Sequence, residues 1–244
     1  MHRKQLVPVL LSLLVIVSSG CLGLGGDNTE EPTSAEAQEL VEQATQSMQD
    51  VDTYTMEMSV EMSTNGQTLS LDTDSVINRT DKRAQVELSV NGMGQAQTIT
   101  SYIINESVYV QQDGTWQSQQ LSDGQSWDSR DHLQQSRKLF EESSVRVVGN
   151  DTVDGTPVRV LEIDADQEAM LDLISQQRDS ISADVSPTDV TLRQYVSTET
   201  NLTRKIEMDM QMGPSGQSAS ASVMIRFSDF GTDTDIAVPD GATS

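Results

Sequence analysis

Cys21 is the only cysteine among the 244 residues, and its surroundings indicate one particular modification of its thiol. It follows an apolar run, Leu6 to Val17, and the small residues 18–20, and two basic residues precede that run. This order is typical of a secretory signal peptide. The small residues also look like a lipobox, the signal for acylating a cysteine and cleaving before it, with Ser18 where an aliphatic residue is most familiar. We therefore expect residues 1–20 to be a signal peptide with a lipobox and Cys21 to be the lipid attachment site.

Two alternatives remain for this segment, an ordinary cleaved signal peptide and an uncleaved anchor. The apolar run would rise only about 18 Å as a helix, short of a hydrocarbon core of about 30 Å. A free thiol on an exported chain would also lack a pairing partner. We therefore predict that the chain is exported and held at the outer face of the cell membrane through acylated Cys21. Residues 21–33, rich in glycine and acidic groups, are expected to form a flexible tether.

No other residues of the sequence combine into a recognisable catalytic or metal motif. His132 is the only histidine outside the expected signal peptide, and no zinc-protease, nucleophile-elbow, phosphate-loop or dinucleotide motif occurs. Acidic pairs such as Asp72 and Asp74 could bind calcium, but a chain with 38 acidic residues contains such pairs by chance. We expect no enzyme activity, no cofactor and no metal site, with a hydrolase or metal-dependent enzyme as the minor alternative.

Methionines recur at every second position in two segments, so their side chains would share one face of a strand. Methionine is flexible and suits an apolar wall that accommodates varied ligands, although core packing and Cu(I) binding are alternatives. The candidate ligand-lining residues are Met56, Met58, Val60, Met62, Met208, Met210 and Met212. Four sequons close to predicted turns are glycosylation candidates for an exported chain, at Asn78, Asn105, Asn150 and Asn201.

The formal net charge is −23, and it becomes −25 when Arg3 and Lys4 are removed with the signal peptide. Such a surface repels itself in dilute salt, whereas at molar salt the Debye length falls to about 3 Å. The composition therefore indicates a halophilic protein. It argues against a nucleic-acid partner, because phosphates need a basic footprint. With one cysteine no intrachain disulfide can form, so a packed core must supply the stability.

The hydrophobic periodicity predicts one helix followed by many strands. Thr33-x-x-Glu36 matches a capping box before apolar residues at helical spacing up to Met48. Strict alternation then begins at Tyr54, and turn signals separate further alternating runs up to residue 227. Two more helices are expected, over 131–142 and from 166. The predicted fold class is α+β, a curled antiparallel half-barrel sheet of about ten strands with helices covering its inner face.

Two stretches of sequence carry a resemblance to a known family. A leading amphipathic helix ends in "SMQDVDTYTMEMSVEMS", and a later strand pair reads "ESVYVQQDGTW". This order resembles the LolA/LppX-like superfamily of lipoprotein carriers and lipid-binding lipoproteins. The acidic residues 231–244 are expected to form a loose tail. The resemblance implies a single domain over 34–230 and an open barrel whose apolar concavity holds acyl chains. It leaves two functions open, a non-catalytic binder of a lipid or other apolar ligand and an envelope interaction module with a filled core.

Overall fold

The computed structural model describes residues 35–64, 66–92, 95–112, 114–121, 127, 143–164, 187–212 and 219–242. All of them belong to one compact unit, residues 32–244. The expected signal peptide, Cys21, the tether, His132 and the two further helices lie outside the described residues.

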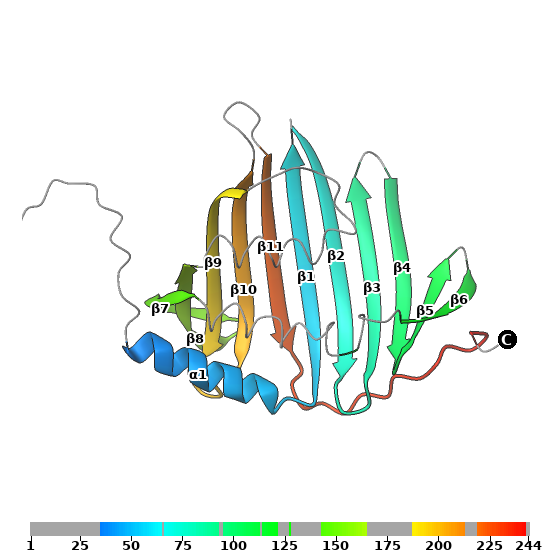
Figure 1. Cartoon of the computed structure of the whole chain (residues 1–244), viewed down its shortest axis with the longest axis horizontal. Helices are drawn as coiled ribbons and strands as arrows, with labels where there is room; N and C mark the ends of the chain where they lie inside the picture. The colour runs from blue at the N-terminus through cyan, green and yellow to red at the C-terminus, as the bar shows by residue number, and fades with distance from the viewer. Residues whose placement is uncertain are drawn as a thin grey trace, which may run out of the picture. The chain divides into compact units, whose positions relative to one another are not determined.

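One antiparallel sheet of eleven strands makes up most of the described chain (Figure 1). Its strand order is β6-β5-β4-β3-β2-β1-β11-β10-β9-β8-β7, so nearly every strand pairs with its neighbour in sequence. The exception is the pairing of β1 with β11, which joins β1–β6 to β7–β11. Because β6 and β7 stand at opposite ends, the sheet is open, and Figure 1 draws the end strands at a steep angle to the central ones. The predicted open, curled antiparallel sheet is therefore confirmed, with eleven strands rather than about ten.

The strand bounds follow the predicted alternation and turns. The strands are β1 Thr53–Thr64, β2 Gln67–Asn78, β3 Arg83–Gly92, β4 Gln95–Ile104, β5 Ser107–Gln112, β6 Thr115–Gln120, β7 Ser144–Val153, β8 Thr156–Asp164, β9 Pro187–Ser197, β10 Thr203–Met212 and β11 Ala219–Ser228. The turn between β7 and β8 shows why the strand boundaries could be predicted from the sequence. Asp154 and Gly155 both have positive φ, 48° and 80°, as a two-residue type I′ hairpin turn requires.

The helix α1 spans Ala35–Gln49 and packs against the sheet through one face. Ala37, Ala44 and Met48 are buried in the same hydrophobic cluster as strand residues such as Tyr54. Arg79, which follows β2, donates from Nη1 to the carbonyl oxygens of Met48, Gln49 and Val51 at 3.2, 3.1 and 2.8 Å. These bonds satisfy carbonyls that a helix end leaves without an intrahelical donor, and the cation also suits the negative end of the helix dipole.

The residues after β11 are fixed against the sheet, which differs from the loose tail that the sequence predicted from residue 231. The Gly231 amide donates to the Thr53 carbonyl at 2.9 Å, and the Thr53 hydroxyl donates to the Thr232 carbonyl at 2.8 Å. Further along, Arg83 Nη1 donates to the Ile236 carbonyl at 2.7 Å, and the Ile236 side chain is 4% exposed. Because this segment is acidic, its composition did not indicate that the Ile236 side chain is buried or that its backbone is hydrogen-bonded to the sheet.

Candidate functional site

The sheet has one mainly apolar face, which we call the inner face and define by Tyr54, Met56, Met58, Val60 and Met62 of β1. Residues directly opposite each other on neighbouring strands project to the same side of a sheet. The register therefore extends the inner face over all the strands. On one side of β1 it continues through mainly apolar residues of β2 to β5, and on the other through β11 to β7.

The two methionine-rich strands lie on the same face, with β11 between them. Val60 stands opposite Val223, which stands opposite Met208. In the next row Met62 faces Ala221, and Ala221 faces Met210. The expectation that each stripe projects to one side is therefore confirmed by the register, and the two stripes join into one apolar surface.

The inner face divides into a buried part and a half-buried part. Its buried part lies near α1, where Tyr54 and Met56 are each 2% exposed and share a cluster with the helix. Met210 is also buried, and the register puts Met212 on the same face. The remaining part, the half-buried patch, keeps large apolar side chains partly accessible. It consists of Met58, Val60, Met62, Leu69, Leu71, Leu88, Val90, Ile99, Met208, Val223 and Ile225.

A buried glutamine interrupts the apolar character of the inner face. Gln194 of β9 is 2% exposed and stands in register between Leu161 and Ile206. Its Nε2 donates to the hydroxyl of Thr203 at 2.6 Å. Thr203 begins β10 where the register with β9 shifts, so this bond ties the two strands together at an irregular point.

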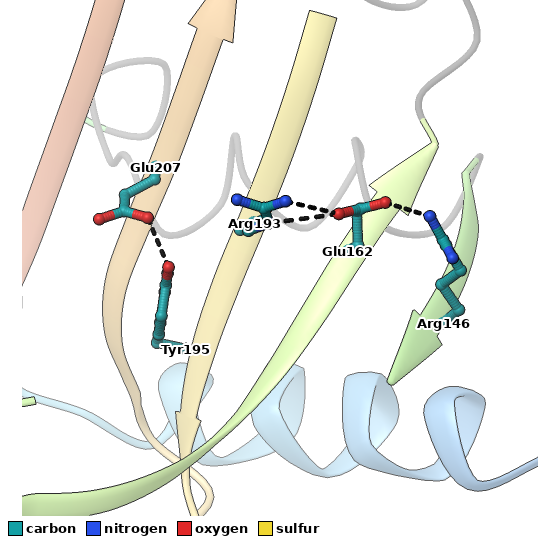
Figure 2. A network of polar contacts seen from close by, with 5 residues as sticks. All are labelled: Arg146, Glu162, Arg193, Tyr195 and Glu207. Atoms are coloured by element: carbon teal, nitrogen blue, oxygen red, sulfur yellow. Dashed lines mark hydrogen bonds and ion pairs between the residues drawn. The ribbon is translucent and has the colours of Figure 1, made fainter. Parts of the chain in front are cut away.

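The opposite, outer face is mainly polar, apart from a small buried cluster of Val153, Val158, Val160 and Tyr195, and it carries a charged network over β7 to β10 (Figure 2). Arg146 forms an ion pair with Glu162, which also accepts from Arg193 Nη2 at 3.0 Å. The Tyr195 hydroxyl donates to Glu207 at 2.5 Å, and Lys205 Nζ lies 2.7 Å from the other carboxylate oxygen of Glu207. These contacts were not predicted from the sequence. Except for Lys205 and Glu207, which are both on β10, the partners lie on different strands, and no local motif links them.

The environment shifts two pKa values in this network. Burial and the hydrogen bond to Glu207 raise the pKa of Tyr195 above its ordinary value. Burial alone would raise the pKa of Glu207, but the hydrogen bonds and charge that it receives from Lys205 and Tyr195 lower it below its usual range. The phenol of Tyr195 therefore stays protonated and the carboxylate of Glu207 stays ionised near neutral pH.

The four sequons have different surroundings. Asn105 and Asn150 are exposed, Asn105 at a turn with φ of 55° and Asn150 within β7. Asn201 is half-buried in the turn between β9 and β10. Asn78 is 8% exposed, and its amide donates to the Asp81 carboxylate at 3.1 Å. The amide nitrogen of a sequon must be accessible to carry a glycan, so Asn105 and Asn150 are the better placed candidates.

Within the described ranges, no three histidine, cysteine, aspartate or glutamate side chains are arranged to hold a metal ion. In the same part of the chain, no helix has the length and apolar character needed to cross a membrane.

The sequence matches the model of a family of unknown function, DUF7537, over residues 9–241. The chain belongs to this family. No curated protein sequence matches this DUF7537 member. Among solved structures, LprF from Mycobacterium bovis is similar at a TM-score of 0.54 and 14% identity, over 87% of this chain and 100% of that one. Lipoprotein LppX from Mycobacterium tuberculosis is similar at 0.52 and 10% identity, over 82% and 97%. At these identities the likeness shows a shared fold, and the predicted LolA/LppX-like fold is confirmed for this DUF7537 chain.

Proposed function

We propose that this protein is an exported lipoprotein that binds a lipid or another apolar ligand on the half-buried patch of its inner face. Acylated Cys21 anchors the chain at the outer face of the membrane, residues 21–33 tether the domain, and the ligand is bound without chemical change. The fold shared with LppX, whose name describes it as a lipoprotein, supports this proposal.

The half-buried patch is the observation that carries the binding role. Isolated exposed apolar side chains are ordinary, whereas a contiguous apolar area left accessible on a folded domain is typical of a binding surface. The patch spans β1, β2, β3, β4, β10 and β11. Three of its members are methionines, whose flexible thioethers fit acyl chains of different shape. The candidate ligand-lining residues thereby reduce to Met58, Val60, Met62 and Met208, while Met56 and Met210 serve the core.

Mass spectrometry of protein purified from its native membrane in mild detergent tests the binding role. We expect a lipid to co-purify at a stoichiometric ratio. Val60→Gln, which places an amide in the middle of the patch, should lower the amount retained. Glu61→Gln is the matched control, because the next residue of β1 projects to the outer face and receives the same side chain. Equal lipid in both variants, or none in the wild-type protein, would contradict the proposal.

A second function is an envelope interaction module with a filled core. The helix α1 already fills one part of the inner face with Ala37, Ala44 and Met48, which favours a core rather than a ligand in that part. Purified protein that is free of lipid and insensitive to Val60→Gln would support this second function.

The anchor has a separate test. Cys21→Ser should release the protein into the medium or leave the signal peptide uncleaved, as seen by fractionation and by the mass of the chain. Unchanged membrane retention together with normal processing would refute acylation, and this outcome is independent of lipid binding by the domain.

A further inference from the structure

The two ends of the open sheet differ in how they are protected against further strand pairing. An edge strand presents unpaired backbone groups, and proteins protect such edges with charges, proline or bulges. At one end, β7 has a bulge between Val147 and Gly149 and carries the charged residues Arg146 and Asp151. At the other end, β6 has the sequence TWQSQQ, with no charge, no proline and a register with β5 that contains no shift. The β6 edge therefore lacks these protective features.

The outward-pointing groups of β6 can be identified from its register. Gln112 and Thr115 flank the turn, and the Leu121 amide donates to the Glu106 carbonyl at 2.7 Å. Hydrogen-bonded pairs alternate along an antiparallel ladder, so Trp116, Ser118 and Gln120 direct their N–H and C=O groups away from β5. Within the described residues β6 pairs with β5 alone, and all of its side chains except Trp116 are exposed.

We propose that the β6 edge is an interaction surface for a second copy of this chain, with the two β6 strands pairing antiparallel about a two-fold axis at Ser118. Ser118 then faces its own copy, and Trp116 of each chain faces Gln120 of the other. In this register every N–H and C=O group that β6 directs away from β5 has a partner on the other chain. About six interchain hydrogen bonds form, two for each of three hydrogen-bonded pairs. Isologous pairing of this kind is the commonest way in which homodimers close.

The distribution of charge favours a second copy at this edge. Residues 95–120 contain only two charged side chains, Glu106 and Asp113, both between strands, although 22% of the whole chain is charged. Two chains this acidic repel each other strongly, and this end of the sheet is where their acidic groups are sparsest. Molar salt screens the remaining repulsion, so the dimer should strengthen as salt rises.

The side chains beside the edge are already positioned for this contact. The Trp116 ring meets Tyr102 edge to face at 5.7 Å between centroids, and Gln120 Nε2 donates to the Ser107 hydroxyl at 2.8 Å. Tyr109 of β5 stands opposite Ser118 rather than opposite Trp116. Because these contacts hold Trp116 and Gln120 against the outer face, little side-chain freedom is lost when the copies pair.

Sedimentation equilibrium in molar salt, at protein concentrations up to about 1 mM, tests the pairing. The wild-type chain should reach a monomer–dimer equilibrium. Ser118→Pro removes an N–H that points away from β5, so the fold should persist while the dimer weakens at least about tenfold. Ser118→Ala is the matched control and should dimerise like the wild type. A monomer at every concentration, or a dimer unchanged by Ser118→Pro, would overturn the proposal.

A disulfide across the two-fold axis gives a readout that does not depend on the proline variant. In a Cys21→Ser background, Ser118→Cys places two thiols on Cα atoms about 5.5 Å apart, within the range that a disulfide bridges. Gln120→Cys is the control, since the four-residue offset separates its two Cα atoms by about 14 Å. Oxidised glutathione should cross-link the first variant at least about tenfold faster. Equal cross-linking of the two variants would contradict the pairing of two copies. The same holds if the chain stays monomeric and its β6 edge binds a segment of another protein.

Discussion

Three acidic side chains stand in one row on the outer face, and this row predicts a measurable dependence of stability on salt. Glu57 of β1 faces Asp74 of β2, and Asp74 faces Glu87 of β3. All three are exposed. Like charges directly opposite on neighbouring strands destabilise a sheet by roughly 0.2–1 kcal/mol a pair. Asp74 takes part in two such pairs, so Asp74→Asn should raise the free energy of unfolding by about 1 kcal/mol in dilute salt.

Salt should remove this gain. Facing Cβ atoms are about 5 Å apart, which is less than the Debye length of about 8 Å at 0.15 M but more than the length of about 3 Å at 1 M. Urea unfolding at the two salt concentrations measures the difference. If the wild-type chain unfolds when salt is removed by dialysis, Asp74→Asn should lower the salt concentration at which half of the chains are unfolded.

Asp72→Asn is the matched control for this prediction. Asp72 lies two residues away on the same strand and face, but it stands opposite Ser59 and Ser89 rather than opposite acids. It also accepts a hydrogen bond from the Ser59 hydroxyl at 2.9 Å. Its substitution should give no gain in dilute salt. Equal stabilisation by both variants would show that total charge decides stability, and a gain for Asp74→Asn that persists at 1 M salt would refute the Coulombic reasoning.

Three further predictions concern the core, the outer-face network and the last residues. Leu161→Ala, at a position with 0% exposure, should lower the free energy of unfolding by about 2–5 kcal/mol in urea titrations. Because the folded pKa of Glu207 is lowered and that of Tyr195 is raised, their contributions are both fully present between about pH 4.3 and 10. The free energy of unfolding should fall as the pH drops through the folded pKa of Glu207, and again as the pH rises through the folded pKa of Tyr195. Tyr195→Phe should remove the loss of stability that Tyr195 causes at alkaline pH, as measured by unfolding at a series of pH values. Ile236→Asp should lower the melting temperature and speed hydrogen exchange at β1, whereas Asp233→Asn, at an exposed position three residues earlier, should leave both unchanged.

The strands could be predicted from the sequence because their signals are local. Alternation from Tyr54 to Met62 and the Asp154-Gly155 turn each depend on residues close together in the chain, so the hairpins and their register follow. Contacts between distant segments carry no such signal. The bonds from Arg79 to the end of α1, the ion pairs of Glu162 and the burial of Ile236 all join segments that only the folded chain brings together.

The candidate site was predicted only in part, and the reason is physical. Period-two alternation placed the methionines on one face of the sheet, but it could not tell which of them α1 would bury. Met56 and Met58 have the same spacing and the same chemistry, and only the position of the helix makes one a core residue and the other half-buried.

The pairing of β1 with β11 has a consequence for the order in which the chain folds. Every other strand contact joins neighbours in sequence, so β1–β6 can form as a meander through short loop closures. The strands β7–β11 need one longer closure, over the 22 residues 165–186 between β8 and β9. The β1–β11 seam links residues 55–64 to residues 219–228 and requires the largest loop in the molecule to close. The two meanders should therefore mature early and join late, and pulse-labelling hydrogen exchange during refolding should protect the amides of this seam last.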